Sequence, residues 1–279
     1  MLESKNEDKT TNSTRREVLR WAGAAALLSR TTAAGDLPVQ NTGLEHFGMT
    51  VPEPEMAARF YGRIFDPQLF QEREPPPRFY VKLGTGYLAF GGNKDSVPSI
   101  DHFCALVDGY KQGELRTLLV DKAGVKMGNG PLGMATDPDG IRFQTLGVPG
   151  GLARTIIPAQ RISQDPPLFQ VVAPQYMILR VTDVAKSAEH YTKIFGAATA
   201  RKADRTVFAV AKTQLILEPV TAGEKPSIYA IGLSVAGFDR KMAVEKLKKI
   251  GVDAAAGPEK NTVRFKDSYG FVTDLKGEA

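Results

Sequence analysis

The 279-residue chain is poor in the residues that most often carry metal-binding or cross-linking chemistry. It holds one cysteine, three histidines and one tryptophan. A single cysteine excludes a disulfide framework and a zinc site built from cysteines. Any metal site must therefore combine very few histidines with carboxylate or amide groups, so the positions of the histidines become the main question.

The chain also lacks a strong charge of either sign and a long hydrophobic run. Its net charge is +5, and the first 34 residues hold six basic and four acidic residues, so the remainder carries only +3. That balance does not indicate a nucleic-acid surface. The apolar run near the N-terminus ends at Arg30, well short of the roughly 20 residues that a membrane span requires. We expect neither a nucleic-acid partner nor a stable membrane span.

The N-terminal segment has the order of an export signal. Arg15 and Arg16 precede a mildly apolar run over residues 21–28, and the small residues 32–34 follow. This order resembles a twin-arginine signal, whereas the alternative is an amphipathic helix with a chance arginine pair. We predict a signal over residues 1–34 and a periplasmic or extracellular location. Because this route exports folded proteins, often with a cofactor already inserted, the signal favours a bound metal.

The rest of the chain repeats itself. Residues 45–51 predict a strand and residues 56–65 a helix, and residues 175–181 and 187–195 repeat that pattern at an offset of 130. The helices end in the similar segments Phe-Tyr-Gly-Arg-Ile-Phe and His-Tyr-Thr-Lys-Ile-Phe, and an Asp-Pro-Asp-Gly turn at 137–140 matches residues 267–270. The chain is therefore an internal duplication.

Each copy contains a second strand and helix of its own. In the first copy the strand at 100–107 leads to a helix at 114–124, and in the second copy residues 229–235 lead to residues 242–250. Three prolines between residues 157 and 168 suppress regular structure and predict an extended linker. We predict a first domain over residues 41–148, a linker over 149–173 and a second domain over 174–277.

Together these features resemble the vicinal oxygen chelate superfamily of glyoxalases, extradiol dioxygenases and bleomycin-resistance-type proteins. The resemblance covers residues 43–148 and 174–276 and implies an α+β fold. Each of the two glyoxalase-type domains would be a pair of βαβββ units that forms a half-open mixed β-barrel. In this superfamily the metal ligands lie on the first and fourth strands of each unit, which in the first copy are His46, Ala89, His102 and Gln144.

Two of the three histidines thus fall on ligand positions, although either could instead be a core or edge histidine bonded to the backbone. His46 and His102 would supply imidazoles and Gln144 an amide oxygen. This set approximates the two-histidine, one-carboxylate arrangement of non-haem iron(II) enzymes, with a neutral amide in place of the usual carboxylate. The resemblance implies a divalent cation, with Fe2+ or Mn2+ favoured and Zn2+ or Ni2+ as alternatives.

The remaining ligand positions depart from the pattern. Ala89 offers no donor where a glyoxalase I carries a glutamate, which favours a dioxygenase-like or lyase-like centre over glyoxalase I. The second copy has Tyr176, Ile216, Ala230 and Asp274 at the matching positions, which do not make a divalent metal site. That copy is either a structural partner or a metal-free binding cleft.

The resemblance therefore implies an exported metal-dependent enzyme acting on a small, oxygen-chelating substrate. The alternative is a non-catalytic small-molecule binder of the bleomycin-resistance type with a degenerate metal site. Tyr80 and Tyr87 are candidates to orient a substrate and Arg142 to neutralise an acidic one, although core packing and solvent exposure are the simpler roles. Cys104 is interpreted as a small core residue and His190 as a helix residue without a catalytic role. The fused duplication is compatible with a monomer or a homodimer.

Overall fold

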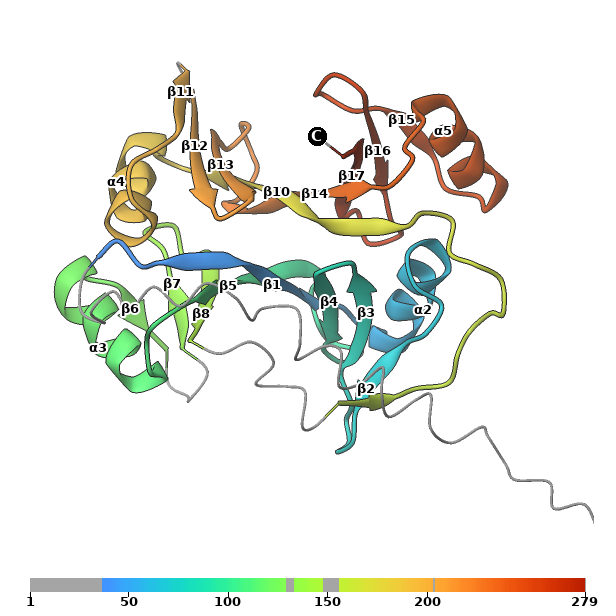
Figure 1. The fold of residues 1–279 in the computed structure, drawn as a ribbon, viewed down its shortest axis with the longest axis horizontal. Helices are drawn as coiled ribbons and strands as arrows, with labels where there is room; N and C mark the ends of the chain where they lie inside the picture. Colours follow the sequence, from blue (N-terminus) through green and yellow to red (C-terminus); the bar gives the residue numbers. More distant parts are fainter. Residues whose placement is uncertain (1–36, 129–132, 148–155, 203, 279) are drawn as a thin grey trace, which may run out of the picture.

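A computed structural model describes residues 37–128, 133–147, 156–202 and 204–278. The signal predicted over residues 1–34 lies outside these ranges. Within them, the predicted unit occurs four times along the chain, each time as a strand, a helix and three further strands (Figure 1). The prediction of four βαβββ units is confirmed.

The first half of the chain forms a nine-stranded mixed sheet. Its two units meet at β1 and β5, which pair antiparallel, and each of these strands pairs in parallel with the last strand of its own unit. The helices are α2 (Pro54–Ile64) and α3 (Gln112–Ala123). In spatial order the strands are β6 (Lys126–Met127), β7 (Met134–Thr136), β8 (Arg142–Leu146), β5 (Ser99–Val107), β1 (Asn41–Thr50), β4 (Gly86–Gly91), β3 (Phe79–Leu83), β2 (Phe70–Glu72) and β9 (Ile156–Pro158).

The second half repeats this arrangement in an eight-stranded sheet with helices α4 (Val184–Phe195) and α5 (Arg240–Lys249). Both sheets are open, with different strands at their two edges, so the predicted α+β class with two half-open mixed sheets is confirmed. In spatial order the strands are β11 (Ala200–Lys202), β12 (Arg205–Val210), β13 (Thr213–Pro219), β10 (Val171–Val181), β14 (Ser227–Val235), β17 (Val272–Gly277), β16 (Thr262–Lys266) and β15 (Ala254–Ala256).

The segment predicted as a proline-containing linker contributes one short strand to the first sheet. Ile156–Pro158 forms β9, which pairs antiparallel with β2. Proline is tolerated there because β9 lies at the edge of the sheet, where a missing N–H leaves no ladder bond unmade. The prolines do exclude an interior strand, but the predicted linker still contains one edge strand, β9.

Local sequence explains where the helices begin and end. The side chain of Asp183 accepts a hydrogen bond from the backbone N–H of Lys186, and Asp239 caps α5 in the same way. Such caps satisfy N–H groups that have no partner inside the helix. Helix α3 ends at Gly124, whose left-handed φ of 66° suits glycine and stops the helix.

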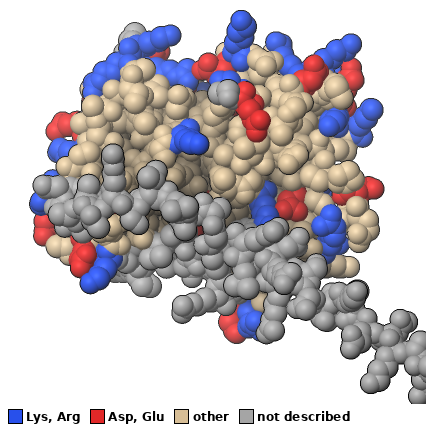
Figure 2. Space-filling view, in the orientation of Figure 1, with Lys and Arg blue, Asp and Glu red and all other residues tan. Residues whose placement is uncertain are grey.

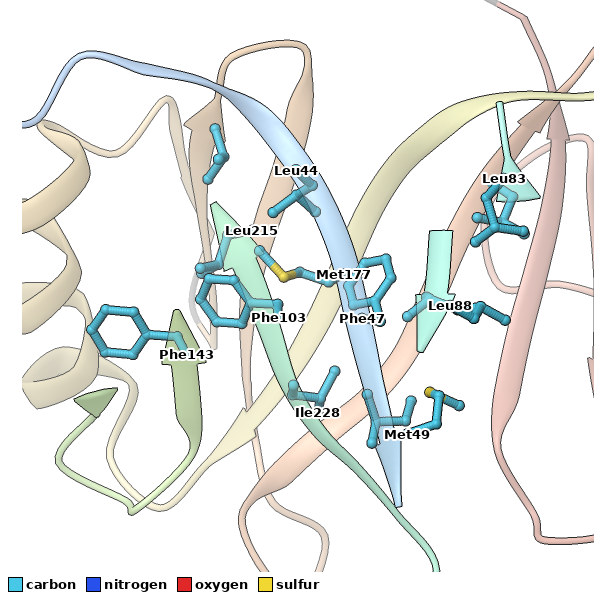
Figure 3. Packing of buried hydrophobic residues seen from close by; sticks show 14 of the residues in the cluster. Leu44, Phe47, Met49, Leu83, Leu88, Phe103, Phe143, Met177, Leu215 and Ile228 are labelled. Carbon is cyan, nitrogen blue, oxygen red and sulfur yellow. The ribbon is translucent and has the colours of Figure 1, made fainter. Parts of the chain in front are cut away.

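A single apolar core joins the two sheets. Figure 3 shows Phe47 and Phe103 of the first sheet packed near Met177 and Leu215 of the second. Successive residues of a strand point to opposite faces, so Phe47 and Phe103 face this core while their neighbours His46 and His102 face the other side of the first sheet. The core therefore holds rigid the strands that carry both histidines.

Two hydrogen bonds related by the duplication tie the halves together. The Tyr61 hydroxyl in α2 donates to Asp267 at 3.1 Å, and the Tyr191 hydroxyl in α4 donates to Asp137, also at 3.1 Å. Each tyrosine is fully buried in the repeated helix ending, and each aspartate opens a repeated turn of the opposite half. Both motifs that revealed the duplication thus act at the contact between the halves.

The surface fits the weak charge of the sequence. On the face shown in Figure 2, basic and acidic side chains are interspersed, mostly around the rim. No helix in the described part of the chain is long and apolar enough to cross a membrane.

Candidate metal centre

Two β-bulges shape the open face of the first sheet. The pairing of β1 with β5 shifts register between Leu44 and His46, and again opposite Asp101, so that Glu45 and Asp101 are the extra residues. A bulge breaks the alternation of a strand and redirects a side chain. Glu45 and Asp101 consequently lie beside His46 and His102 rather than on the opposite face.

The two predicted histidine ligands face each other. The Nε2 atoms of His46 and His102 lie 3.1 Å apart, and their rings meet nearly perpendicular, with a 5.2 Å centroid separation. His46 is 3% and His102 9% exposed. Two imidazole nitrogens bound to one cation at about 2.1 Å and a right angle would be about 3.0 Å apart. The separation therefore fits two ligands of one ion.

The hydrogen bonds on the other side of each ring indicate which nitrogen carries the proton and which has an available lone pair. His46 Nδ1 lies 3.1 Å from a Glu45 carboxylate oxygen, and His102 Nδ1 lies 2.7 Å from Asp101. An ionised carboxylate only accepts, so each Nδ1 must carry the proton, and a neutral ring then presents a lone pair at Nε2. Two lone pairs facing each other at 3.1 Å repel unless a proton or a metal cation lies between them. The donor set thus fits a shared metal ion.

The charge state of the ring supports the same conclusion. Burial lowers the pKa of His46 more than its hydrogen bond to Glu45 raises it, so this imidazole is neutral at neutral pH and free to bind a metal. Burial would raise the pKa of Asp101, but His102 and Arg142 outweigh burial and hold it below its ordinary value. Asp101 is therefore ionised and accepts from His102.

A glycine makes room for His102. A Cβ at position 48 would lie 2.2 Å from Cε1 of the His102 ring, so the ring leans over the backbone of β1 at this point. Gly48 and His102 are register partners in the β1–β5 ladder. Position 48 must stay without a side chain for His102 to reach His46.

Gln144 lies on β8, where it is buried and pairs in register with Cys104 of β5. Cys104 in turn pairs with His46. In the second half, the residues equivalent to His46 and Gln144 are Tyr176 and Asp274, and their side chains meet at 2.7 Å. The duplication therefore indicates that Gln144 faces the same space as His46.

A second combination of donors lies on the other side of the His46 ring. Single donor atoms of Glu45, His46 and Cys104 lie within 4.8 Å of one another. The thiol of Cys104 is 3.9 Å from the Glu45 carboxylate, and burial raises its pKa well above the ordinary value. Cys104 is then a thiol that donates toward Glu45, which favours the Nε2 side of His46 as the metal side.

The predicted substrate residues Tyr80 and Tyr87 form a buried aromatic wall next to the histidines. Tyr87 stacks on His46 with a centroid separation of 4.9 Å, and Tyr80 packs against Tyr87 and Ala89. The Tyr80 hydroxyl donates to Glu72, and the Tyr87 hydroxyl donates to Glu45. Both hydroxyl groups are therefore engaged with carboxyl side chains, and both rings pack inside the fold.

Arg142 lies at the exposed end of β8. Its guanidinium donates to Asp101 at 2.6 Å, while the other oxygen of Asp101 faces His102. Arg142, Asp101 and His102 thus form one chain of contacts. Its position suits holding Asp101 more directly than neutralising a substrate.

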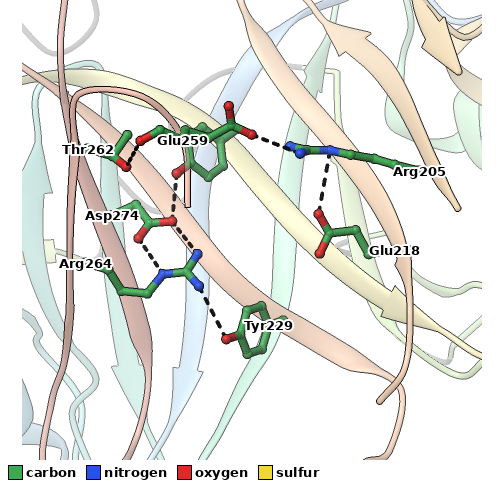
Figure 4. Close-up of polar contacts among 8 residues, drawn as sticks. Arg205, Glu218, Tyr229, Glu259, Thr262, Arg264 and Asp274 are labelled. Atoms are coloured by element: carbon green, nitrogen blue, oxygen red, sulfur yellow. Dashed lines mark hydrogen bonds and ion pairs between the residues drawn. The ribbon is translucent and has the colours of Figure 1, made fainter. Parts of the chain in front are cut away.

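The matching positions of the second half are filled by an internal ion pair. The buried carboxylate of Asp274 receives two hydrogen bonds from Arg264 at 2.7 Å each, and one from Tyr176 (Figure 4). The Arg180 guanidinium lies 3.4 Å from the centre of the Tyr229 ring. A guanidinium therefore occupies the cationic role in this half, which explains why its residues do not suit a metal.

Glu45 and Asp101 are the site residues that the sequence reasoning missed. Strict alternation along β1 and β5 puts each of them on the face opposite its histidine. A signal was nevertheless present, because each histidine directly follows an acidic residue, as Glu45-His46 and Asp101-His102. Only the bulges reveal why these neighbours meet.

Comparison with known proteins supports the fold. No protein-family model and no curated protein matches the chain. Solved structures do match, at probability 1.00. A Mn(II)-bound glyoxalase from Novosphingobium aromaticivorans is 15% identical with a TM-score of 0.61, covering 85% of this chain and 82% of that one. A catechol 2,3-dioxygenase is 13% identical with a TM-score of 0.63, covering 86% and 89%.

A third structure, homoprotocatechuate 2,3-dioxygenase from Arthrobacter globiformis, is 13% identical with a TM-score of 0.60, covering 88% of this chain and 82% of that one. At such identities the likeness concerns the fold. The chain therefore shares the fold of this glyoxalase and these dioxygenases.

Proposed function

We propose that this chain is a metal-dependent, dioxygenase-like enzyme acting on a small substrate that presents two adjacent oxygen atoms. The observation that carries the proposal is the 3.1 Å separation between the Nε2 atoms of His46 and His102, with each Nδ1 held by a carboxylate. Gln144 would complete the ligand set with its amide oxygen. Fe2+ or Mn2+ suits two imidazoles and an oxygen donor.

The residues around the histidines would divide the remaining tasks. A divalent ion at this site would supply a Lewis-acidic centre for chelating adjacent substrate oxygens. The rings of Tyr87 and Tyr80 would pack against a planar substrate, and Ala89 would leave the fourth ligand position to the substrate or solvent. Glyoxalase I activity is not proposed because Ala89 offers no carboxylate for proton transfer.

Several of the structural neighbours are dioxygenases, which favours dioxygenation over the other reactions that this fold supports. Fold alone does not carry a reaction, because one fold hosts many chemistries. The geometry of the histidine pair is therefore the main support, and the neighbours only narrow the choice.

The test begins with metal content. Purified protein is expected to bind about one equivalent of Fe2+ or Mn2+, and His46→Ala and His102→Ala are each expected to abolish binding. After anaerobic reconstitution with Fe2+, oxygen uptake in aerated buffer with a panel of catechols then tests dioxygenation. A metal-free protein that binds a small molecule with His46→Ala unaffected would contradict the enzyme and favour a non-catalytic binder.

We also propose that the chain is exported through the twin-arginine route, on the strength of Arg15 and Arg16 before the apolar run. A fusion of residues 1–36 to a reporter that is active only after folded export tests this. Export that persists after Arg15→Lys with Arg16→Lys would contradict the proposal.

A further inference from the structure

Position 144 carries an amide where a carboxylate is usual. Two carboxyl groups lie nearby, not against the proposed ion itself but behind the histidine rings that would bind it. Glu45 and Asp101 each hold the Nδ1 of one histidine, at 3.1 Å and 2.7 Å. Glu45 is 6% exposed, and the Tyr87 hydroxyl also donates to it at 3.3 Å. Each of the two imidazoles is thus backed by a carboxyl side chain.

The bulges that position these acids are a feature of the fold and do not depend on acidic side chains. In the second half, β10 and β14 shift register in the same way, and the extra residues there are Gln175 and Tyr229. Neither is acidic, and the adjacent ligand positions hold Tyr176 and Ala230. Acids therefore occupy the bulge positions in the half whose candidate ligand positions hold histidines, and not in the other half.

We infer that Glu45 and Asp101 are positioning residues that supply, through the imidazoles, the negative charge that Gln144 does not provide. A carboxylate bonded to the far nitrogen of a ligand histidine fixes its tautomer, orients the ring and makes it a better donor. This inference rests on the proposed function, since it concerns the same metal site. Arg142 supports the position of Asp101, because its guanidinium donates to that carboxylate at 2.6 Å.

Isosteric amides test the inference. Glu45→Gln and Asp101→Asn keep a hydrogen-bond acceptor for Nδ1 but remove the charge. Each is expected to weaken Mn2+ binding by about 10- to 100-fold, measured by calorimetry. Glu218→Gln is the matched control, because it removes one negative charge from β13 of the second half without contact to either histidine, and its affinity should equal wild type.

A rescue experiment separates charge from packing. Gln144→Glu, introduced into the Glu45→Gln, Asp101→Asn double variant, should recover at least tenfold in Mn2+ affinity, because it restores a negative charge beside the ion. A purely structural loss would not be recovered. The visible absorption of bound Co2+ should differ between wild type and the double variant and reports on the ligand environment without requiring activity.

The outcomes are distinct. If wild type binds Mn2+ and both amide variants bind within twofold of it, the inference is overturned while the proposed metal site stands. If His46→Ala binds as tightly as wild type, the proposed function fails and the inference falls with it. Asp101 is only half-buried, so Asp101→Asn decides the question if Glu45→Gln does not fold, as judged by circular dichroism.

Discussion

The imidazole of His102 lies directly over the backbone of Gly48, where a Cβ would come within 2.2 Å of Cε1. The contact is with a side-chain ring, so a larger residue would displace the ring before it displaced the strand. Position 48 thereby controls whether His102 reaches His46. This relationship leads to a prediction with an internal control.

Gly48→Ala should push His102 away from His46 and lower Mn2+ affinity by more than tenfold, measured by calorimetry. The extra methyl group should also cost about 1–3 kcal/mol in unfolding free energy. Gly232→Ala is the control, because a Cβ there would come 2.3 Å from the Tyr176 ring in the second half. The Gly232→Ala variant should lose a similar amount of unfolding free energy but bind Mn2+ with the affinity of wild type. Equal affinity of both variants would contradict the role of Gly48.

His190 should make stability depend on pH. Burial, and secondarily the charge of Lys193, lowers the pKa of His190 to about 4, against an ordinary value of 6.5. The unfolded chain therefore takes up a proton below pH 6.5 that the folded chain refuses. The stability associated with neutral His190 is present above pH 6.5 and is lost as the pH falls toward 4.

The variant that checks this is His190→Phe, which copies Phe60 from the equivalent position of the first half. It should be more stable than wild type at pH 5 by about 1 kcal/mol, after discounting for partial exposure, and the gain should shrink at pH 8. Urea unfolding at both pH values measures the difference. A gain that is equal at pH 5 and pH 8 would rule out the proton-linked explanation.

The paired Tyr–Asp bonds should stabilise the contact between halves independently. Tyr61→Phe and Tyr191→Phe each remove one donor to a carboxylate, of the partly buried Asp267 and the buried Asp137, which should cost about 1–2 kcal/mol in unfolding free energy. The two bonds belong to α2 and α4, which lie at opposite ends of the molecule (Figure 1). The double variant should therefore lose about the sum. A marked departure from additivity in urea unfolding would show that the two contacts are coupled.

The ion pair of the second half should matter for stability and not for metal binding. Arg264→Ala leaves the fully buried carboxylate of Asp274 without its cation and should cost roughly 3 kcal/mol. Mn2+ affinity and stoichiometry should remain those of wild type, because the histidines lie in the other half. Calorimetry together with thermal unfolding measures both. A loss of metal binding would mean that the second half contributes to the site.

Much of the architecture could be predicted from periodicity and repetition. The strand-helix-strand units and the duplication follow from patterns that local physics imposes, since strand and helix periods are properties of the backbone. The candidate ligand positions of His46 and His102 were instead implied by the resemblance to a known superfamily. The short strand β9 was not predicted, because an edge strand is stabilised by its partner β2 and not by its own three residues.

The site itself was predicted only in outline. Alternation puts His46 and His102 on one face, but it cannot show that their Nε2 atoms meet, since that depends on the missing side chain of Gly48 and the lean of the His102 ring. It also misplaced Glu45 and Asp101, because a bulge is a property of two paired strands. Asp137 and Asp267 were interpreted as turn residues, and only the packed halves bring Tyr191 and Tyr61 to them.

Residue types and their spacing are enough to predict the class of fold, the duplication and the small number of side chains that could bind a metal. These depend on residue type and spacing, which are local. Only the tertiary structure shows that the Nε2 atoms of His46 and His102 face each other, that Glu45 and Asp101 contact their Nδ1 atoms, and that Arg264 pairs with Asp274 in the second half. Those properties arise from the register between strands and the packing between halves, which bring together residues far apart in the chain.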